Sequence, residues 1–140
     1  MPNLNDTMFA RPPIYASPVD AEELKALAAG AGGANPGGAL LRQEVERLLI
    51  GPPEKHVPFV RLGSWVAYRD LRTKRERHVR VVRPEQATPE ENYISVLSPL
   101  GAALIGLAQD AIFRWSGPDG RLRAVKVLQI LPDQQQASGA

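Results

Sequence analysis

The periodicity of the sequence changes abruptly between residues 94 and 107, and this change constrains the fold more than any other feature. Residues 94–98 place their side chains alternately on two faces, as an extended strand does. Ser98 and Pro99 then mark a helix start, because a serine oxygen can accept an unpaired backbone N–H and proline at the first helical position loses no hydrogen bond. The segment therefore predicts a strand that leads directly into a helix.

After Pro99 the apolar residues follow a helical period. Leu100, Leu104 and Leu107 recur at spacings i, i+4 and i+7, which gives the helix one apolar stripe. Gly106 can supply the left-handed residue that commonly ends a helix. The expected helix is barely two turns long.

Two short helices are predicted before the sheet. The first begins at Ser17 and Pro18, and the glycine-rich segment 30–38 ends it because glycine disfavours helix. The second runs from about Ala39 to Leu49 and stops before Gly-Pro-Pro at 51–53. We expect the two helices to form a short antiparallel hairpin over residues 14–53.

Residues 57–131 are dominated by strand signals. Val57–Arg69 and Arg77–Arg83 should pair across the charged turn 71–76, and residues 84–92 should form a loop. Two further strands, Ala111–Trp115 and Leu122–Leu131, flank the sequence Gly-Pro-Asp-Gly, which is typical of a hairpin turn. The segments 1–13 and 133–140 are expected to be disordered.

The 140 residues, of which 44% are hydrophobic, can bury one core, so we expect one compact domain with an appendage. The chain has no cysteine, which excludes disulfides, thiolate metal sites and cysteine nucleophiles. The first residues lack the basic and apolar regions of a signal peptide, and no apolar run approaches the ~20 residues that span a bilayer. We therefore expect a cytoplasmic protein without membrane contact.

No pattern in the chain indicates catalysis. His56 and His78 are isolated and lack the spacing of metal ligands. Ser95 and Ser98 lack the glycines of a nucleophile elbow. The segment 30–38 has neither a preceding strand nor a following Lys-Ser or Lys-Thr, so we interpret it as a turn rather than a phosphate-binding loop. We expect no catalytic residue, no metal and no cofactor, and hence no enzyme.

Basic residues concentrate around the turn between the first two predicted strands. Two interpretations stay open, a solvated hairpin face and a contact with an anion or RNA, and a net charge of +2 does not decide between them. The aromatic side chains of the strands are interpreted as core residues rather than as a base-stacking platform. The predicted basic patch consists of Arg72, Lys74, Arg75, Arg77 and Arg80, with Arg69 and Arg83 beside it.

The run Ser-Pro-Leu-Gly at 98–101, followed by Ala-Leu-Ile-Gly at 103–106, resembles the C-terminal FKBP-like domain of the Gre transcript-cleavage factors. The strong resemblance extends from Val57 to Ile130. Within this family the chain is most similar to the Rnk group, the regulators of nucleoside diphosphate kinase, and a weaker similarity continues to the N-terminus. The resemblance implies an α+β fold: a short antiparallel helical hairpin, then an FKBP-like antiparallel β-sheet domain with one short helix over residues 54–132.

The resemblance also implies a partner. Gre factors dock their FKBP-like domain on the rim of the secondary channel of RNA polymerase, formed by a large subunit, and a long coiled coil carries two carboxylates to the catalytic magnesium. The predicted helices of about 11 residues reach only roughly 17 Å. The tip at 30–38 contains no Asp or Glu. We therefore expect polymerase binding and competition with Gre factors, without transcript cleavage.

The expected polymerase contact is Leu97, Ser98, Pro99 and Leu100, which match the polymerase-facing loop of the Gre family. Helix capping and core packing explain the same residues equally well, and for Leu100 core packing is favoured. Two other functions stay open: a peptidyl-prolyl isomerase, which the FKBP-like architecture alone would suggest, and a nucleic-acid-binding module that uses residues 69–83. We expect a monomer, with at most a weak nucleic-acid contact.

Overall fold

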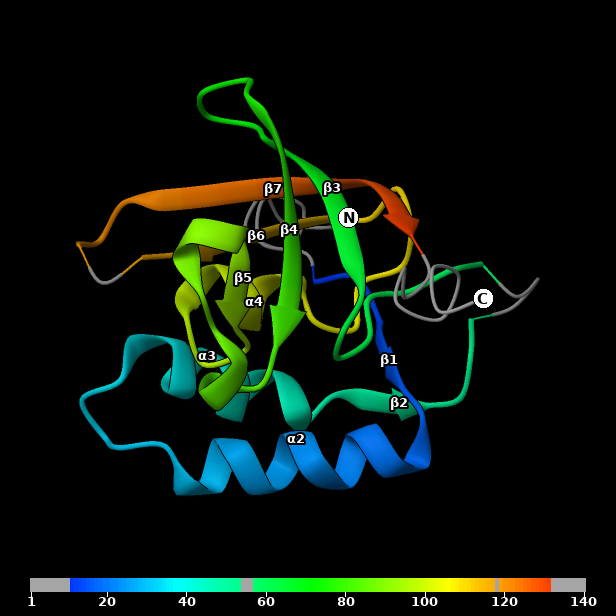
Figure 1. The fold of residues 1–140 in the computed structure, drawn as a ribbon, viewed down its shortest axis with the longest axis vertical. Helices are drawn as coiled ribbons and strands as arrows, with labels where there is room; N and C mark the ends of the chain where they lie inside the picture. Colours follow the sequence, from blue (N-terminus) through cyan, green and yellow to red (C-terminus); the bar gives the residue numbers. More distant parts are fainter. Residues whose placement is uncertain (1–10, 54–56, 118, 132–140) are drawn as a thin grey trace, which may run out of the picture.

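The computed structural model describes residues 11–53, 57–117 and 119–131, and Figure 1 shows their arrangement. The chain begins with strand β1 (Ile14–Ala16) and helix α2 (Pro18–Gly30). The Ser17 side-chain oxygen accepts a hydrogen bond from the Asp20 N–H at 3.2 Å, which caps α2. Helix α3 (Pro36–Val45) follows a short turn, and strand β2 (Leu48–Ile50) then pairs in parallel with β1.

The main sheet has five strands in the order β5-β4-β3-β7-β6. Strand β3 pairs antiparallel with β4 and β7, and β7 pairs antiparallel with β6, whereas β4 and β5 are parallel. Two 3-10 turns, η2 (Pro84–Gln86) and η3 (Pro89–Glu91), lie in the connection between β4 and β5 and bring the chain back before β5 begins. The strands are β3 (Trp65–Asp70), β4 (Glu76–Val82), β5 (Tyr93–Ser95), β6 (Ile112–Ser116) and β7 (Leu122–Leu131).

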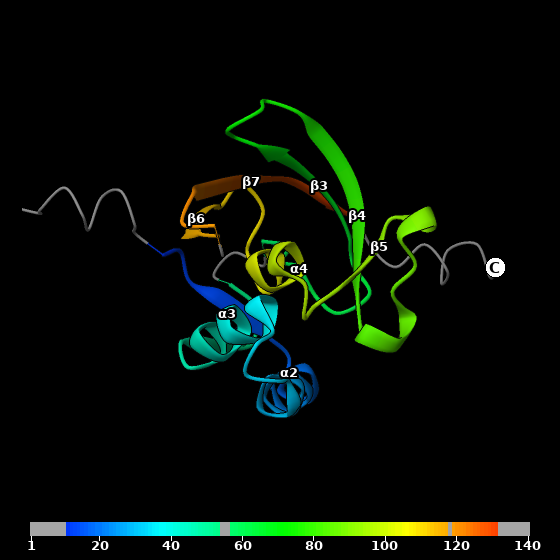
Figure 2. The ribbon, with the colours of Figure 1, turned by 90° about the vertical axis from the view of Figure 1, so that its left-hand side faces the viewer.

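The elements stack in layers. Figure 2 shows the main sheet curling over α4 (Pro99–Leu104), with α3 beneath α4 and α2 outermost. The hydrophobic core joins these layers: Leu24 of α2 and Leu41 of α3 belong to the same buried cluster as Phe113 and Val127 of the sheet. No helix in the described part of the chain is long and apolar enough to cross a membrane.

The structure confirms the α+β class, the helix start at Ser17 and the strand-to-helix change at Ser98. It also confirms that the strands before and after the charged turn pair, and that Ile112–Ser116 pairs with Leu122–Leu131. The predicted start of the first strand at Val57 is wrong: β3 begins at Trp65, because the chain turns at Leu62 and Gly63, and β4 begins at Glu76 rather than Arg77. The sheet was predicted to be antiparallel and is instead mixed, since β5 runs parallel to β4. Gly106 follows Ile105, the C-cap of α4, and has a φ of +82°, as the helix-ending residue was expected to have. Leu107, which was predicted to continue the apolar stripe of the helix, lies beyond its end.

The predicted bounds of the second helix are wrong at both ends. Helix α3 begins at Pro36 because Asn35 caps it: the Asn35 side-chain oxygen accepts a hydrogen bond from the Gly38 N–H at 2.9 Å. The helix ends at Val45 rather than Leu49, because residues 48–50 pair with β1. The glycines at the start of α3 belong to the helix and not to the turn.

Some predictions fall outside the described residues. Of the predicted disorder at 1–13 and 133–140, residues 1–10 and 133–140 lie outside the described residues, as do His56 and Pro118. For residues 11–13 the prediction is wrong, because Arg11 pairs with Glu44 and the Pro12 carbonyl oxygen accepts a hydrogen bond from Arg47. Residues 11–13 precede β1 as a chain without regular structure.

Candidate functional site

The predicted contact residues lie at the corner between β5 and α4, where hydrogen bonds fix the backbone. The Ser95 side-chain oxygen accepts from the Leu97 N–H at 2.9 Å, and the Ser98 hydroxyl donates to the Ser95 carbonyl oxygen at 2.6 Å. The Ser98 oxygen also accepts from the Gly101 N–H at 3.1 Å, which makes Ser98 the N-cap of α4. One hydroxyl therefore caps the helix and ties its start to the end of the strand.

The corner also requires a glycine after its cap. A Cβ atom on Gly101 would lie 2.1 Å from the Ser95 carbonyl oxygen, which is closer than real Cβ contacts. The backbone of α4 sets the position of the Cβ atom, and the oxygen belongs to the backbone of β5, so no side-chain rotation can relieve the clash. A side chain at position 101 would therefore force the strand and the helix apart. The Ser-Pro-Leu-Gly run is thus a structural unit of the corner.

Leu97, Ser98, Pro99 and Leu100 are all half-buried. Leu97 and Leu100 pack against the hydrophobic core, which is the packing role that the sequence suggested for Leu100. Ser98 and Pro99 begin α4 and keep part of their surface in solvent. Ser98, Pro99 and Leu100 line one hollow, whereas Leu97 does not line it. Contact of the four residues with a partner stays a prediction.

Two hollows adjoin Pro99, with volumes of about 470 Å³ and about 460 Å³. Pro99 and Trp115 line both of them. The second hollow extends toward α3, where Leu40 and Gln43 line it. The first is lined by both apolar and cationic side chains, including Ile94, Leu100, Val125, Arg72, Arg77 and Arg123. Pro99 therefore stands between two recesses of a surface that offers both apolar area and positive charge.

Tyr68 also lines the first hollow, and its hydroxyl has an altered proton affinity. Burial raises the pKa of Tyr68 above its usual value, the positive charge of Arg77 opposes this shift, and Asp70 adds to it. The group is therefore a neutral phenol at physiological pH. It can donate or accept a hydrogen bond, and it adds no charge to the hollow.

Helix α3 covers the rear of the corner. A Cβ atom on Gly37 would lie 1.8 Å from the Leu97 carbonyl oxygen and 2.5 Å from the Ser98 carbonyl carbon. Only glycine allows the two backbones to approach so closely. The start of α3 is therefore part of the support of the corner, which sequence analysis assigned to a free turn.

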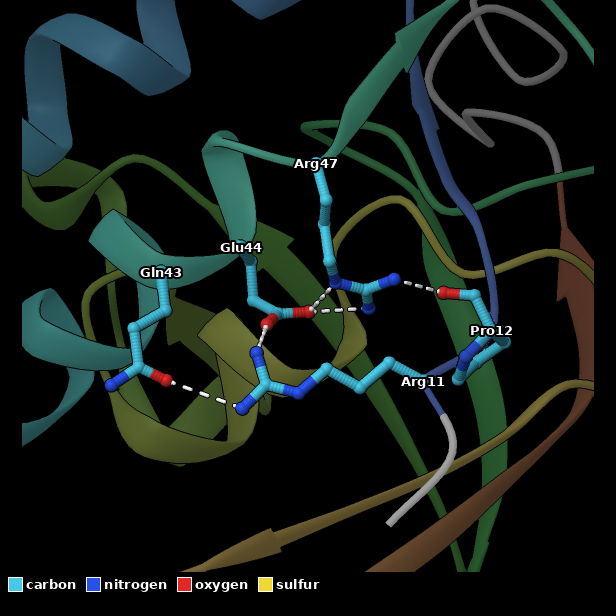
Figure 3. A network of polar contacts seen from close by, with 5 residues as sticks. All are labelled: Arg11, Pro12, Gln43, Glu44 and Arg47. Carbon is cyan, nitrogen blue, oxygen red and sulfur yellow. Dashed lines mark hydrogen bonds and ion pairs between the residues drawn. The ribbon is translucent and has the colours of Figure 1, made fainter. Parts of the chain in front are cut away.

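A buried ion cluster holds the other end of α3, as Figure 3 shows. Glu44 is only 2% exposed and forms ion pairs with Arg11 at 2.8 Å and with Arg47. Arg47 also donates to the Pro12 carbonyl oxygen, and its guanidinium lies 5.8 Å from the centre of the Phe113 ring. These contacts tie the segment before β1 to α3 and to the sheet.

The ion cluster around Glu44 was not predicted from the sequence, although the position of Glu44 on the helix is a signal for it. Glu44 lies three residues after Leu41 and one before Val45, so it falls on the apolar face of the helix. A carboxylate on such a face is expected to be paired, because an isolated buried charge is costly. Arg47, three residues after Glu44, could have been proposed as a partner from helical spacing. Arg11 is 33 residues away in the sequence and could not be identified without the fold.

The structure divides the predicted basic patch. Arg72, Lys74, Arg75 and Arg77 are exposed on the hairpin formed by β3 and β4. Arg80 is 7% exposed, donates to the Gly63 carbonyl oxygen at 2.8 Å and to the Tyr93 hydroxyl at 3.3 Å, and does not belong to an exposed patch. The prediction that Arg80 belongs to an exposed basic patch is wrong, because both faces of β4 are covered where Arg80 lies.

The two neighbouring arginines of the predicted patch are engaged in ion pairs. Arg69 pairs with Glu76 on the adjacent strand, and Arg83 pairs with Glu23 of α2. The hydrogen bond from Arg83 lowers the pKa of Glu23 below its usual value, although partial burial opposes the shift. Hydrogen bonding to Glu23 likewise raises the pKa of Arg83. The second pair links the outermost helix to the sheet.

The remaining candidates do not assemble into a site. His78 is exposed on β4. Within the described ranges, no group of three or more His, Cys, Asp or Glu side chains could hold a metal ion. The turn between α2 and α3, at residues 31–35, contains only Ala, Gly and Asn.

Comparisons with known proteins extend this description. The family model for "Transcription elongation factor, GreA/GreB, C-term" matches residues 53–132. The "Regulator of nucleoside diphosphate kinase" of Escherichia coli strain K12 is 31% identical over 133 residues, which cover 94% of this chain and 97% of that protein. The "Transcription elongation factor GreA" of Syntrophobacter fumaroxidans is 40% identical over 68 residues, covering 49% of this chain and 43% of that factor.

Similar solved structures include a Gre-family protein. The "Prokaryotic transcription elongation factor GreA/GreB from Nitrosomonas europaea" matches with a TM-score of 0.63 and 29% identity, and the match covers 87% of this chain and 100% of that chain. The family match contains the Ser98–Pro99 corner and leaves out α2 and α3. Similarity to the kinase regulator runs through nearly the whole chain, whereas similarity to this GreA covers less than half of either protein.

Proposed function

Because the chain belongs to the family of the GreA/GreB C-terminal domain, we propose that it regulates transcription by binding RNA polymerase. The contact would be made by the sheet domain at the rim of the secondary channel. Leu97, Ser98, Pro99 and Leu100 are the residues proposed to touch the polymerase. The protein would act as a binding factor rather than as an enzyme.

The observation that carries this proposal is the construction of the corner between β5 and α4. Its backbone is fixed by the Ser98 hydroxyl, and Pro99 lies between two hollows. A rigid corner loses little conformational entropy when a partner binds, so its surface can be used efficiently for docking. The half-buried state of Ser98 and Pro99 leaves them area with which to make that contact.

We further propose that the protein competes with Gre factors without stimulating cleavage. Helices α2 and α3 have 13 and 10 residues. At a rise of 1.5 Å per residue their lengths are only about 20 Å and 15 Å. Helix α3 is held against the corner by Gly37, and the turn 31–35 supplies no carboxylate to bind magnesium. A factor of this shape would occupy the rim and leave the polymerase active site unassisted.

An effect on nucleoside diphosphate kinase is part of the proposal. It rests on the name of the Escherichia coli relative, which describes that protein as a regulator of the kinase. We give this effect less weight than the polymerase contact, because no feature of the described structure points to the kinase.

The test is a pull-down of core RNA polymerase with the tagged protein, with and without an excess of a Gre factor. The protein should retain polymerase, and the Gre factor should displace it. Ser98→Asp should weaken retention at least several-fold, because it adds a charge to the contact while Asp keeps the N-cap. Asp cannot donate the hydrogen bond that Ser98 gives to the Ser95 carbonyl oxygen, so urea denaturation of the variant is measured alongside. Undiminished retention by this variant would show that the corner is not the contact.

A matched pair of proline variants tests the corner without adding charge. Pro99 begins α4 and Pro89 begins η3, and both are the first residues of a helical turn. Pro99→Ala should reduce retention of polymerase, and Pro89→Ala should not. Equal behaviour of the two variants would contradict the proposed contact.

A further inference from the structure

We propose that the β3–β4 hairpin is a second binding site, which adjoins the polymerase contact through Arg72 and Arg77 and binds the phosphate backbone of nucleic acid. Its ligands would be the side chains of Arg72, Lys74, Arg75 and Arg77. The site would recognise charge and shape rather than sequence. RNA and DNA share this chemistry, and the experiment below distinguishes them.

The first observation is the balance of charge within the hairpin. Residues 69–77 contain five basic side chains and two acidic ones. Both carboxylates are already engaged. Asp70 accepts hydrogen bonds from the N–H groups of Arg72 and Thr73, at 2.9 and 3.2 Å, and Glu76 pairs with Arg69. The other four cations have no ion pair among the residues that the structure describes.

The second observation is the position of these four cations. Each of them is exposed, and the hairpin that carries them extends past β7 in both views of the molecule (Figures 1 and 2). Its turn is well defined, because the Lys74 N–H donates to the Asp70 carbonyl oxygen at 2.7 Å and Lys74 has a φ of +65°. A narrow two-stranded ribbon of this kind can approach a phosphate backbone, or enter a groove, without steric conflict from the rest of the chain.

The third observation distinguishes nucleic acid from an acidic protein surface. Specific protein interfaces combine charge with a buried apolar centre. The large hydrophobic residues that are exposed in the described structure lie elsewhere: Val19, Leu49, Ile50 and Leu122. Lys74 and Arg75 line neither hollow beside Pro99, whereas Arg72 and Arg77 line the first of them. Binding at the tip of the hairpin would therefore draw on counterion release, which is the driving force of binding to a polyelectrolyte.

The aromatic residues of the hairpin indicate that the site would not recognise bases by stacking. Tyr68 is buried, and the Trp65 ring packs edge-on against Tyr93 with centroids 5.7 Å apart. Neither ring is free to stack on a base, which is how sequence-tolerant single-strand sites gain part of their affinity. Contacts would therefore be made with phosphates, and affinity should depend steeply on salt.

The experiment measures binding of the full chain to labelled 20-nucleotide single-stranded RNA and to duplex DNA of the same length, by fluorescence anisotropy at several salt concentrations. Four phosphate contacts predict a slope of log K against log salt of about −3 for RNA and slightly steeper for duplex DNA. Similar behaviour of both probes supports backbone recognition. Absence of binding to both at about 50 mM salt would overturn the proposal.

Two charge-reversal variants separate the site from the overall charge. Arg72→Glu with Arg75→Glu should lower affinity at least tenfold and make the slope shallower by about two. Lys25→Glu with Arg121→Glu makes the same change in net charge at exposed positions outside the hairpin and should have much less effect. Equal losses in the two double variants would mean that only net charge matters and would overturn the site.

Two further measurements complete the test. Arg72→Gln with Arg75→Gln removes the charges without adding acids, and it should also weaken binding, so the proposal does not depend on the folding of the Glu variant. Polyglutamate serves as the acidic-protein probe. If it binds as tightly as RNA, with the same dependence on Arg72 and Arg75, the site would be one for acidic protein segments and the proposal would be wrong.

Discussion

The molecule has two exposed turns with opposite construction. The turn between α2 and α3, residues 31–35, is built from Ala, Gly and Asn and is anchored on its helix side, where Gly37 meets the backbone of Leu97. The turn between β3 and β4, residues 71–75, carries three cations and extends beyond the sheet (Figure 1). The turn 31–35 is neutral and belongs to a packed layer, whereas the turn 71–75 is positively charged and projects from the sheet.

This difference indicates where substitutions should act. In the layer formed by α2 and α3, packed side chains, and glycines that have none, set the distances between neighbouring elements. Substitutions there should therefore reduce the free energy of unfolding. In the β3–β4 hairpin, exposed charges make few contacts, so changes there should affect binding and leave stability almost unchanged. The following predictions test that separation, from the largest expected effect on stability to the smallest.

The largest effect is expected for Gly37→Ala. The added Cβ would meet the Leu97 carbonyl oxygen at 1.8 Å, and α3 would have to move away from the corner. We expect a loss of about 3 kcal/mol or more in the free energy of unfolding, measured by urea denaturation. Gly30→Ala is the matched control, because it lies in α2 with open space around it and should stabilise the helix by roughly 0.5–1 kcal/mol. Equal effects would show that the close approach is not maintained in solution.

Glu44→Ala should follow. Its removal leaves Arg11 and Arg47 without their shared carboxylate, and breaking a fully buried pair costs about 3–5 kcal/mol. The two arginines keep side-chain exposures of 41% and 24%, so we expect a smaller loss of about 2–3 kcal/mol. Glu46→Ala, a change of the same residue type two positions later in the chain, should cost far less. A neutral result for Glu44→Ala would mean that the cluster does not hold the N-terminal segment.

A smaller, pH-dependent effect is expected for Glu23→Gln. The hydrogen bond from Arg83 lowers the pKa of Glu23 in the folded state, so the pair stabilises the fold above the unfolded pKa of the carboxyl group. This contribution is lost as pH falls through the lowered pKa. The wild-type chain should therefore lose more stability between about pH 5 and pH 3 than the Gln variant does, and the loss should be well below that of Glu44→Ala. Glu22→Gln, an exposed neighbour, should leave the pH profile of the wild type unchanged.

The smallest effect on stability is expected for Arg75→Gln. The side chain is exposed at the tip of the hairpin, and the turn is held by backbone contacts and by Asp70. The free energy of unfolding should change by less than about 0.5 kcal/mol. A loss comparable to that of Glu44→Ala would remove the contrast between the two regions.

The sequence predicted those elements whose signals are local. Ser17–Pro18 and Ser98–Pro99 were identified as helix starts because a cap and a proline act within one turn, and the β6–β7 hairpin followed from its turn residues. The bounds of α3 could not be predicted in the same way. Gly37 and Gly38 disfavour helix by themselves, and they are tolerated because the packed neighbours leave no room for a side chain.

Other features were decided by distant residues. Residues 48–50 form a strand because β1 offers them a partner, and the charge of Arg80 is buried because Gly63 and Tyr93 accept its hydrogen bonds. The strand-to-helix corner at Leu97–Leu100 was predicted correctly, and its contact with the polymerase stays a prediction. The support of that corner by α3 lay beyond what periodicity can indicate, since it depends on the approach of two backbones.

The most direct test of the central claim uses transcription complexes halted with a backtracked RNA, in which Gre-stimulated cleavage releases short 3′ fragments. The account predicts that the protein alone leaves the RNA intact and that, in excess, it slows cleavage by an added Gre factor, whereas the Ser98→Asp variant slows it much less. Stimulation of cleavage by the protein alone would contradict the account, because the described helices and their neutral turn would then have to support the chemistry.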